Sequence, residues 1–475
     1  DWDGFAMAGL RPVLVLDGAE VPIREARLDG AALAYAFGDS AALHLALEPS
    51  GFAGLRITPT LRNVSDRPFV LNRAVLLGTS AEGPGATLEK TPGAVRVLEQ
   101  GNYWGHVRPL FEAPPAADAQ GAGEPTGSAQ NPNRASDLVC VLYDRMARMA
   151  LLTGFESSER WFGRFELTPR VSEGIVDWQA GFDGGDLVVE PGEALALETL
   201  LVAAGSDPWA LLEQYGDAVR ARHAPEILDV PPVSWCSWYP YRLGVTEDRI
   251  LDTARVAAER LKPLGLSIIE MDLGWEKDQL PSTFEENDQF PHGLKWLSEQ
   301  LDALGLKLGA WKAPFTISEF DPLAKEHPEW LIQGDDGQRV AYWTWFWAPH
   351  GNVYILDLTH PGARDWLRQK MQSLHDRGIR YLKSDFIGCV SGGQAKNRYD
   401  RHIVMGGGVE AARLGAQVIR EALPDALLLN CGGPEMPGSG HWPVLYTCSD
   451  TGNTGFITAA FERENYQSVA CHLFK

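Results

Sequence analysis

The first 205 residues contain short hydrophobic runs that alternate with polar positions and are separated by Gly, Asp, Ser and Pro. The clearest of these runs span residues 13–16, 32–37, 43–47, 55–61, 69–77, 139–143 and 194–202. Short β-rich runs with turn residues between them are typical of antiparallel sandwiches. We therefore predict that residues 1–205 form a large antiparallel β-sandwich domain.

Residues 206–230 carry the signals of a linker helix. Asp207 is a capping residue, Pro208 follows it at the first helical position, and apolar residues then recur at helical spacing. Pro231-Pro232 ends this segment. We therefore expect a linker helix between two domains.

From Val233 onward, apolar strands alternate with amphipathic helices. The predicted strands span residues 233–238, 267–272, 306–311, 381–385, 426–431 and 444–448. The predicted helices between them span residues 247–262, 294–304, 361–377 and 409–423. Nearly continuous hydrophobic strands that alternate with helices predict a parallel sheet with right-handed crossovers.

This succession favours a (β/α)8 TIM-type barrel for residues 231–475, so the expected fold class is multidomain, α/β plus all-β. A doubly wound open sheet is the alternative, but the glycine fingerprint after the first strand is missing. Residues 468–474 would form a seventh strand, and the sequence ends at Lys475. We therefore expect a catalytic barrel that is incomplete at its C-terminus.

Charge and composition narrow the classes of function. The chain has 42 Lys and Arg against 63 Asp and Glu, a formal net charge of -21. Such a chain repels phosphate backbones and anionic lipid surfaces, so neither nucleic acid nor a membrane is an expected partner. The 16 Trp residues favour carbohydrate, because aromatic faces stack on sugar rings as well as filling cores.

The six cysteines lack the spacing of a metal site. They are scattered without a CxxC pair, so neither a zinc site nor a disulfide framework is indicated. A reduced, cytoplasmic compartment therefore fits best. The sequence also has no apolar span of about 18 residues and no basic-then-apolar leader at its start. Whether the chain forms a homo-oligomer is left open.

Polar residues at the ends of the predicted strands are the candidates for chemistry, because a barrel enzyme keeps its active site there. These ends carry Trp238, Asp272, Trp311 with Lys312, Lys383 with Asp385, Asn430 with Cys431, and Ser449 with Asp450. Asp385 and Asp450 form the carboxyl pair that glycoside hydrolysis needs, one to attack the anomeric carbon and one to protonate the leaving oxygen. Helix capping or turn formation is the alternative duty for either aspartate.

Lys383 and Asp385 are two residues apart in a predicted strand. Their side chains therefore lie on the same face, and a lysine cation favours the ionised form of a nearby carboxyl group. We expect Lys383 to keep Asp385 charged, as a nucleophile requires.

The motifs of the second region resemble glycoside hydrolase family 36, the retaining α-galactosidases and their relatives. They are Trp235-Cys-Ser-Trp238, Asp272-Leu-Gly-Trp275, Trp311-Lys-Ala-Pro314, Tyr354-Ile-Leu-Asp357, Tyr381-Leu-Lys-Ser-Asp385, Asn430-Cys-Gly-Gly433 and Cys448-Ser-Asp450. They occur in order across the region from Val233 to Asn465. The N-terminal region resembles the large β domain of the same family.

The resemblance implies a retaining double displacement on an α-glycoside or oligosaccharide, without a metal or an organic cofactor. It implies that Asp385 is the nucleophile and Asp450 the acid/base. The residues that it implies for substrate binding are Asp272, Trp311, Lys383, Cys431, Gly432 and Trp238.

Leu273 departs from the family pattern. Two adjacent aspartates grip the outer hydroxyls of galactose in that family, whereas here Asp272 is followed by Leu273. A hydrogen bond to a charged group is worth about 1.5–3 kcal/mol, which is enough to change the preferred sugar. We expect hydrolysis of terminal α-galactosides or a closely related α-linked sugar. A raffinose-synthase-like transglycosylase and a non-catalytic carbohydrate-binding relative are the alternatives.

Overall fold

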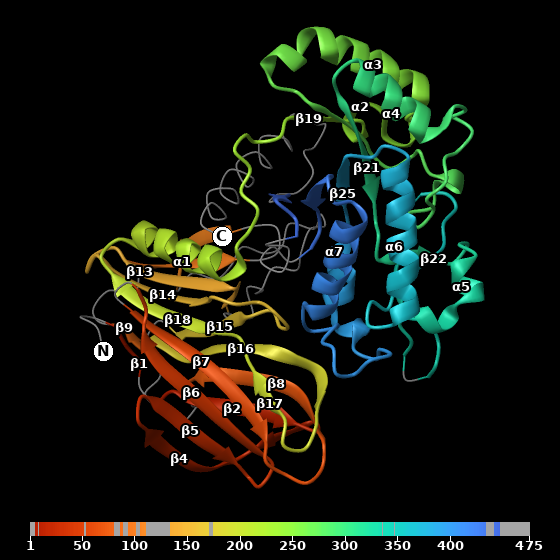
Figure 1. Cartoon of the computed structure of the whole chain (residues 1–475). Coiled ribbons are helices and arrows are strands. Elements are labelled where there is room, and N and C mark those ends of the chain that lie inside the picture. The colour runs from red at the N-terminus through yellow and green to blue at the C-terminus, as the bar shows by residue number, and fades with distance from the viewer. Residues whose placement is uncertain are drawn as a thin grey trace. The chain divides into compact units, whose positions relative to one another are not determined.

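The computed structural model describes residues 5–7, 9–51, 54–79, 86–88, 94–100, 105–110, 134–170, 174–334, 336–345, 347–433 and 441–446. The described residues form two compact units, the first reaching to Ala224 and the second spanning Pro225–Tyr446. Figure 1 shows the elements of both units, coloured from red at the N-terminus to blue near the C-terminus.

The described residues of the first unit form two antiparallel sheets and one helix. The eight-stranded sheet contains β1 (Phe5–Met7), β2 (Arg11–Leu16), β3 (Ala19–Val21), β8 (Phe69–Gly78), β9 (Ala86–Leu88), β12 (Arg134–Asp137), β15 (Arg164–Arg170) and β16 (Gly174–Val189). The ten-stranded sheet contains β4 (Ile23–Asp29), β5 (Ala32–Phe37), β6 (Ala41–Pro49), β7 (Gly54–Asn63), β10 (Val95–Gln100), β11 (Gly105–Pro109), β13 (Val139–Asp144), β14 (Met149–Phe155), β17 (Ala194–Ala196) and β18 (Leu200–Gly205). The predicted strand runs all fall within these strands, although run 194–202 is divided between β17 and β18.

Helix α1 (Pro208–His223) begins at the predicted cap, where the Asp207 carboxylate accepts from the Trp209 backbone N–H over 2.9 Å. Its buried Tyr215 donates from the hydroxyl to the Phe155 carbonyl oxygen over 2.8 Å. Gly154 leaves room for that ring, since a Cβ there would lie 2.5 Å from it. The helix that we expected as a linker therefore packs against β14 in the first unit.

The second unit is organised around a six-stranded parallel sheet. Its strands, in spatial order, are β19 (Ser234–Cys236), β20 (Ile268–Met271), β21 (Lys307–Lys312), β25 (Tyr381–Ser384), β26 (Leu427–Asn430) and β27 (Val444–Leu445). All of them coincide with predicted strands, and neighbours in the sheet follow one another in this order along the chain. A doubly wound sheet reverses its order at a switch point, whereas this sheet progresses in one direction as a barrel does.

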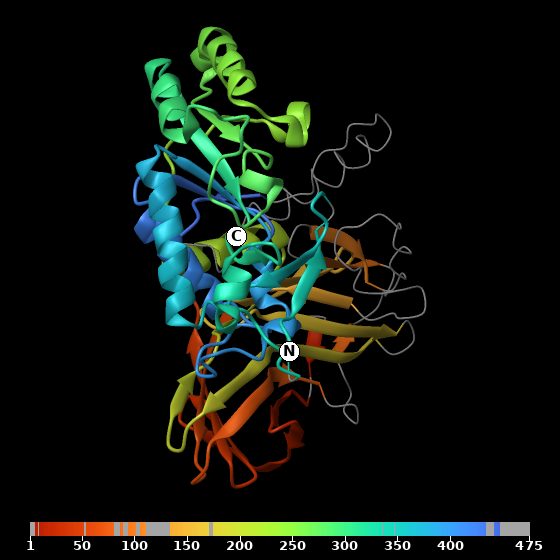
Figure 2. The same ribbon diagram turned by 90° about the vertical axis from the view of Figure 1, so that its right-hand side faces the viewer.

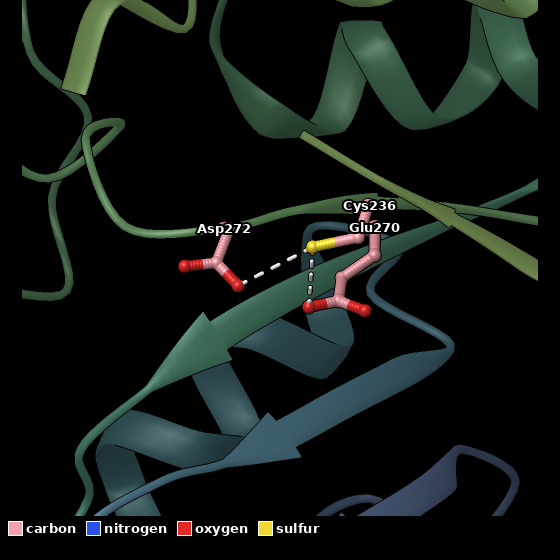
Figure 3. Close-up of side chains that lie close together, drawn as sticks. All are labelled: Cys236, Glu270 and Asp272. Carbon is pink, nitrogen blue, oxygen red and sulfur yellow. Dashed lines mark hydrogen bonds between the residues drawn. The ribbon is translucent and has the colours of Figure 1, made fainter. Parts of the chain in front are cut away.

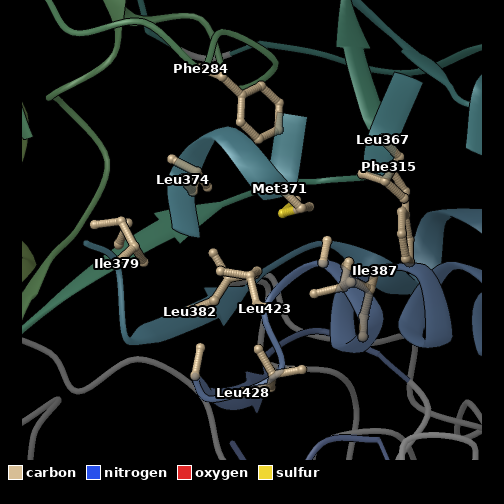
Figure 4. Close-up of a cluster of buried hydrophobic side chains, with 14 of the residues drawn as sticks. Phe284, Phe315, Leu367, Met371, Leu374, Ile379, Leu382, Ile387, Leu423 and Leu428 are labelled. Carbon is tan, nitrogen blue, oxygen red and sulfur yellow. The ribbon is translucent and has the colours of Figure 1, made fainter. Parts of the chain in front are cut away.

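Four helices connect these strands and begin and end within about two residues of their predicted positions. They are α3 (Glu247–Arg260), α4 (Gly293–Ala303), α6 (Pro361–Asp376) and α7 (Glu410–Ala422). Helices α6 and α7 pack against each other along the sheet (Figures 1 and 2). Leu367, Met371 and Leu374 of α6 meet Leu382 of β25 and Leu428 of β26 in the main core (Figure 4).

A small antiparallel sheet interrupts the succession between β21 and β25. It contains β22 (Thr316–Ser318), β23 (Ala341–Thr344) and β24 (Asn352–Ile355), with β24 in the middle. The short helices are α2 (Trp238–Tyr241), α5 (Leu323–Glu326), η2 (Arg242–Gly244), η3 (Lys262–Leu264), η4 (Lys277–Gln279), η5 (Pro328–Trp330), η6 (Ile387–Ser391) and η7 (Gly393–Ala395). Of the helices in the described ranges, none combines the length and apolar character needed to cross a membrane.

Candidate active site

Asp385 lies directly after β25, at the carboxyl edge of the parallel sheet. Its backbone N–H donates to the Lys312 carbonyl oxygen over 2.8 Å, which extends the pairing with β21 by one residue. One carboxylate oxygen, Oδ2, accepts from Trp311 Nε1 over 2.9 Å, and Oδ1 accepts from the Phe386 backbone N–H over 2.8 Å. These bonds hold the carboxylate in one orientation.

The surroundings of Asp385 act on its ionisation in opposite directions. Burial raises the pKa of this carboxyl group, while the positive charge of Lys383 and the hydrogen bond from Trp311 lower it. The carboxylate is therefore less well hydrated than an exposed one but keeps partners that favour its charged form. This combination suits a nucleophile.

Lys383 makes its hydrogen bond to Asp272 rather than to Asp385, on which it acts through its charge. Its Nζ atom is 2.9 Å from Asp272 Oδ2 and 3.9 Å from Glu270 Oε1. Burial alone would lower the pKa of Lys383, but the two carboxyl groups raise it well above its usual value. The lysine is therefore a permanent cation that is shared among three acidic side chains.

Gly309 leaves space on β21, between β20 and β25, for the side chain of Tyr381. Gly309 pairs with Glu270 on one side and with Tyr381 on the other. A Cβ at Gly309 would lie 2.6 Å from the Tyr381 ring. Glu270, Gly309 and Tyr381 thus lie at one level of the sheet, and Lys383 lies at the next level, beside Trp311.

Cys236, Glu270 and Asp272 form a compact cluster beside this lysine (Figure 3). The Cys236 sulfur lies 3.5 Å from both Glu270 Oε1 and Asp272 Oδ2, and its one proton can be donated to either oxygen. Three such side chains within 4.8 Å of one another could in principle ligate a metal ion. The set does not fit one, because the Lys383 ammonium already contacts Asp272 and because burial raises the pKa of the Cys236 thiol.

Sequence reasoning overlooked Glu270, although the signal was present. Glu270 and Asp272 are two residues apart in a predicted strand, so their side chains share a face. An acidic residue inside an otherwise apolar strand is rarely buried without a partner. Lys383 was identified because it is two residues from Asp385 in a strand. The same spacing between Glu270 and Asp272 would have identified Glu270.

An aromatic cluster is linked to Asp385 through Trp311. It consists of Leu273, Trp311, Ala313, Trp345 and Val353, with Trp238, Leu243, Trp343, Trp347 and Phe386 packed against it. The Trp238 ring meets Trp347 edge to face at 5.3 Å between centroids, and the Trp343 ring meets Phe386 in the same way at 4.1 Å. Two expected substrate-binding residues, Trp238 and Trp311, are thus brought into one cluster. The tryptophans at 343, 345 and 347 were missed, although their spacing by two was visible.

Cys431 and Gly432 lie after β26, at the same edge of the sheet as Asp385. The Cys431 backbone N–H donates to the Ser384 carbonyl oxygen over 2.8 Å. Gly432 adopts a φ of 76°, in the left-handed region, and its carbonyl oxygen accepts from the Gly388 backbone N–H over 2.8 Å. Both residues therefore follow directly from the strand next to the one that delivers Asp385.

Asp450 lies outside the described residues, so its expected position opposite Asp385 stays a prediction. Tyr446, the last described residue, follows β27. Its ring lies 5.8 Å from Lys383 Nζ, and its hydroxyl lies 3.2 Å from the Tyr239 hydroxyl. The chain therefore passes the Lys383 cluster four residues before Asp450.

Replacement of Leu273 by aspartate, the residue that the family pattern has there, should destabilise the protein by about 3 kcal/mol. Leu273 is 2% exposed and belongs to one buried apolar cluster with Trp311, Trp345 and Val353, where a carboxylate would lose its hydration. Leu273→Met, of similar volume, should cost less than about 1.5 kcal/mol. Denaturant unfolding of the three proteins measures the difference, and an aspartate variant as stable as the methionine variant would contradict this packing.

A family model described as Melibiase matches residues 211–403. Among curated proteins, α-galactosidase 2 of Pediococcus pentosaceus is 28% identical over 156 residues, which is 31% of this chain and 20% of that protein. α-Galactosidase Mel36A of Lactobacillus acidophilus is 28% identical over 169 residues, 34% of this chain and 21% of the relative. The aligned region thus spans about a fifth of each curated relative.

Solved structures show the same fold over nearly the whole chain. The α-galactosidase TtGalA of Thermus thermophilus, in complex with p-nitrophenyl α-D-galactopyranoside, has a TM-score of 0.63 at 20% identity and covers 94% of this chain and 82% of its own. The family 36 α-galactosidase AgaA of Geobacillus stearothermophilus also has a TM-score of 0.63, at 16% identity, and covers 98% of this chain and 64% of its own. The Melibiase model thus matches residues 211–403, and the solved structures show that the chain has the fold of α-galactosidases.

Proposed function

We propose that this chain is a retaining α-glycosidase that hydrolyses terminal α-galactosides or a closely related α-linked sugar. The observation that carries the proposal is the position of Asp385. Its carboxylate is fixed by Trp311 and by the backbone at the carboxyl edge of a parallel sheet, with the Lys383 cation and the Asp272 carboxylate beside it. This is the arrangement that a carboxylate nucleophile needs.

In the proposed first step, one Asp385 oxygen attacks the anomeric carbon while the bond from that carbon to the leaving oxygen breaks. Asp450 donates its proton to the leaving oxygen. In the second step, water attacks the glycosyl ester on Asp385, and Asp450 takes up the proton of that water. Two inversions at one carbon give a product with the configuration of the substrate.

The proposed binding site has one polar and one aromatic side. Asp272 and Lys383 offer a hydrogen-bond acceptor and a donor for sugar hydroxyls, whereas Trp311 and Trp238 offer flat apolar faces. Relatives in solved complexes hold p-nitrophenyl α-D-galactopyranoside, stachyose and raffinose, which supports an oligosaccharide as substrate here. Cys431 and Gly432 would line the same edge.

The architecture that we propose for the whole chain is an antiparallel β-sandwich domain followed by a (β/α)8 barrel. The order of the parallel strands supports the barrel, because each strand is followed along the sheet by the next one in the chain. Trp238, Asp272, Asp385 and Cys431 would then all lie at its catalytic end.

A panel of p-nitrophenyl α-glycosides tests the proposal. The panel contains galactose, N-acetylgalactosamine, glucose and arabinopyranose, and the configuration of the first product is followed by proton NMR. We expect the galactoside or the arabinopyranoside to be the best substrate and the first product to be the α-anomer. A β-anomer as first product would exclude double displacement. A disaccharide product formed without free sugar would identify a transglycosylase instead.

A further inference from the structure

Glu270 is a buried acidic residue to which the proposed mechanism gives no role. It lies on β20, is 3% exposed and is two residues before Asp272, on the same face. The groups that face it are the Cys236 thiol from β19, Asp272 from its own strand, and Tyr381 and Lys383 from β25. A single cation therefore serves two carboxyl groups within 4.8 Å of each other.

This arrangement is stable only if the two carboxyl groups are not both charged. Two carboxylates this close repel each other, and one of them retains its proton more strongly than an isolated carboxyl group. Asp272 has the shorter contact with the cation, at 2.9 Å against 3.9 Å for Glu270. The proton therefore belongs to Glu270, whose carboxyl group hydrogen-bonds to Asp272.

We propose that Glu270 is a positioning residue for substrate binding: in its protonated form it donates a hydrogen bond to Asp272 and, with Lys383, fixes that carboxylate to accept a hydroxyl group of the sugar. The proposal rests on the glycosidase function proposed above. It assigns to Glu270 a part in holding the substrate through Asp272, without direct contact with the reacting atoms.

The titration of Glu270 supports the proposal. Burial raises its pKa to about 8, Lys383 opposes that rise and Asp272 adds to it. Burial also raises the pKa of the Cys236 thiol and of the Tyr381 hydroxyl, so both stay neutral in this range. Above pH 8, Glu270 loses its donor proton, repels Asp272 and competes for Lys383.

Kinetics as a function of pH test this role on p-nitrophenyl α-D-galactopyranoside. The KM of the wild type should rise above pH 8 while kcat changes less. Glu270→Gln, which keeps a neutral donor, should have a KM that is flat through this range. Glu270→Leu, which has no donor, should raise KM about tenfold at neutral pH. A wild-type KM that stays flat through pH 8, or a wild-type KM in Glu270→Leu, would overturn the proposal.

The pH dependence of the melting temperature tests whether Glu270 is protonated, and this measurement needs no enzymatic activity. Because the folded state holds this proton to higher pH than the unfolded state, ionisation of Glu270 destabilises the fold, and the cost grows between about pH 5 and about pH 8. The melting temperature of the wild type should therefore fall relative to that of Glu270→Gln over this range. If the melting temperatures of the wild type and Glu270→Gln changed in parallel with pH, Glu270 would not be protonated in the folded protein and the proposal would be wrong. If the wild type hydrolysed none of the glycosides but its melting temperature still fell relative to that of Glu270→Gln, the glycosidase function would be rejected. The protonated state of Glu270 beside Asp272 would still be supported.

Discussion

Asp385→Asn is expected to lower kcat on p-nitrophenyl α-D-galactopyranoside by about 10⁴-fold or more. The amide cannot form the glycosyl ester of the first step, because its oxygen is a poor nucleophile and its nitrogen has no free lone pair. Substrate binding should change little, because the neighbouring Asp272, Lys383 and Trp311 remain in place. Steady-state kinetics on the full chain measures the loss.

Asparagine has nearly the same shape as aspartate, so Asp385→Asn should fold like the wild type. The melting temperature of the variant is therefore the control. The amide oxygen can still accept from Trp311 Nε1 or from the Phe386 backbone N–H, as the carboxylate does. The melting temperature should therefore stay near that of the wild type. A second variant, Asp385→Gly, leaves space at the nucleophile position. Azide added to it should attack from that side and yield a β-glycosyl azide, whereas an α-azide or full activity in Asp385→Asn would exclude the proposed role.

The parallel sheet of the second unit could be predicted from sequence because its hydrophobic pattern is simple. Its four central strands, β20, β21, β25 and β26, are largely buried and therefore read as nearly continuous apolar runs. The helices between them begin at recognisable signals such as Thr246 and Pro361, at α3 and α6. Such signals are local, so no knowledge of the tertiary structure was needed.

The small sheet of β22, β23 and β24 was not predicted as a unit. Its strands are three to four residues long and belong to a long connection between β21 and β25, so their alternation is too short to distinguish from a loop. The consequence for the site is large. This insertion brings Trp343, Trp345 and Trp347 next to Trp311 and Trp238.

The candidate site was only partly predictable. Spacing by two placed Lys383 on the same face as Asp385, but it could not tell that the lysine contacts Asp272 and lies 3.9 Å from Glu270. That contact depends on the register of three neighbouring strands, β20, β21 and β25. Local spacing identifies the side chains that share a face, whereas the partner of each depends on neighbours that are distant in sequence.

Replacement of Lys312 is expected to have a large effect on the stability of the fold, because this lysine belongs to a buried ion pair. Its side chain points away from that of Trp311 and is completely buried, as is the side chain of its partner Glu276 at 3.2 Å. The ammonium also lies 4.7 Å from the Phe284 ring and 5.1 Å from the Trp275 ring. The pair thus joins the loop after β20 to the end of β21.

Lys312→Met should destabilise the protein by about 3–5 kcal/mol at neutral pH, because it leaves Glu276 buried without its cation. The pair replacement Lys312→Met with Glu276→Gln should recover much of this loss, since no uncompensated charge remains. Burial raises the pKa of Glu276 even with the lysine present. Without the lysine the glutamate should protonate more readily still, so the penalty of Lys312→Met should shrink as pH falls and grow as pH rises. Denaturant unfolding at several pH values measures this trend. A loss below about 1 kcal/mol, or one that is independent of pH, would show that the buried pair does not hold these two segments together.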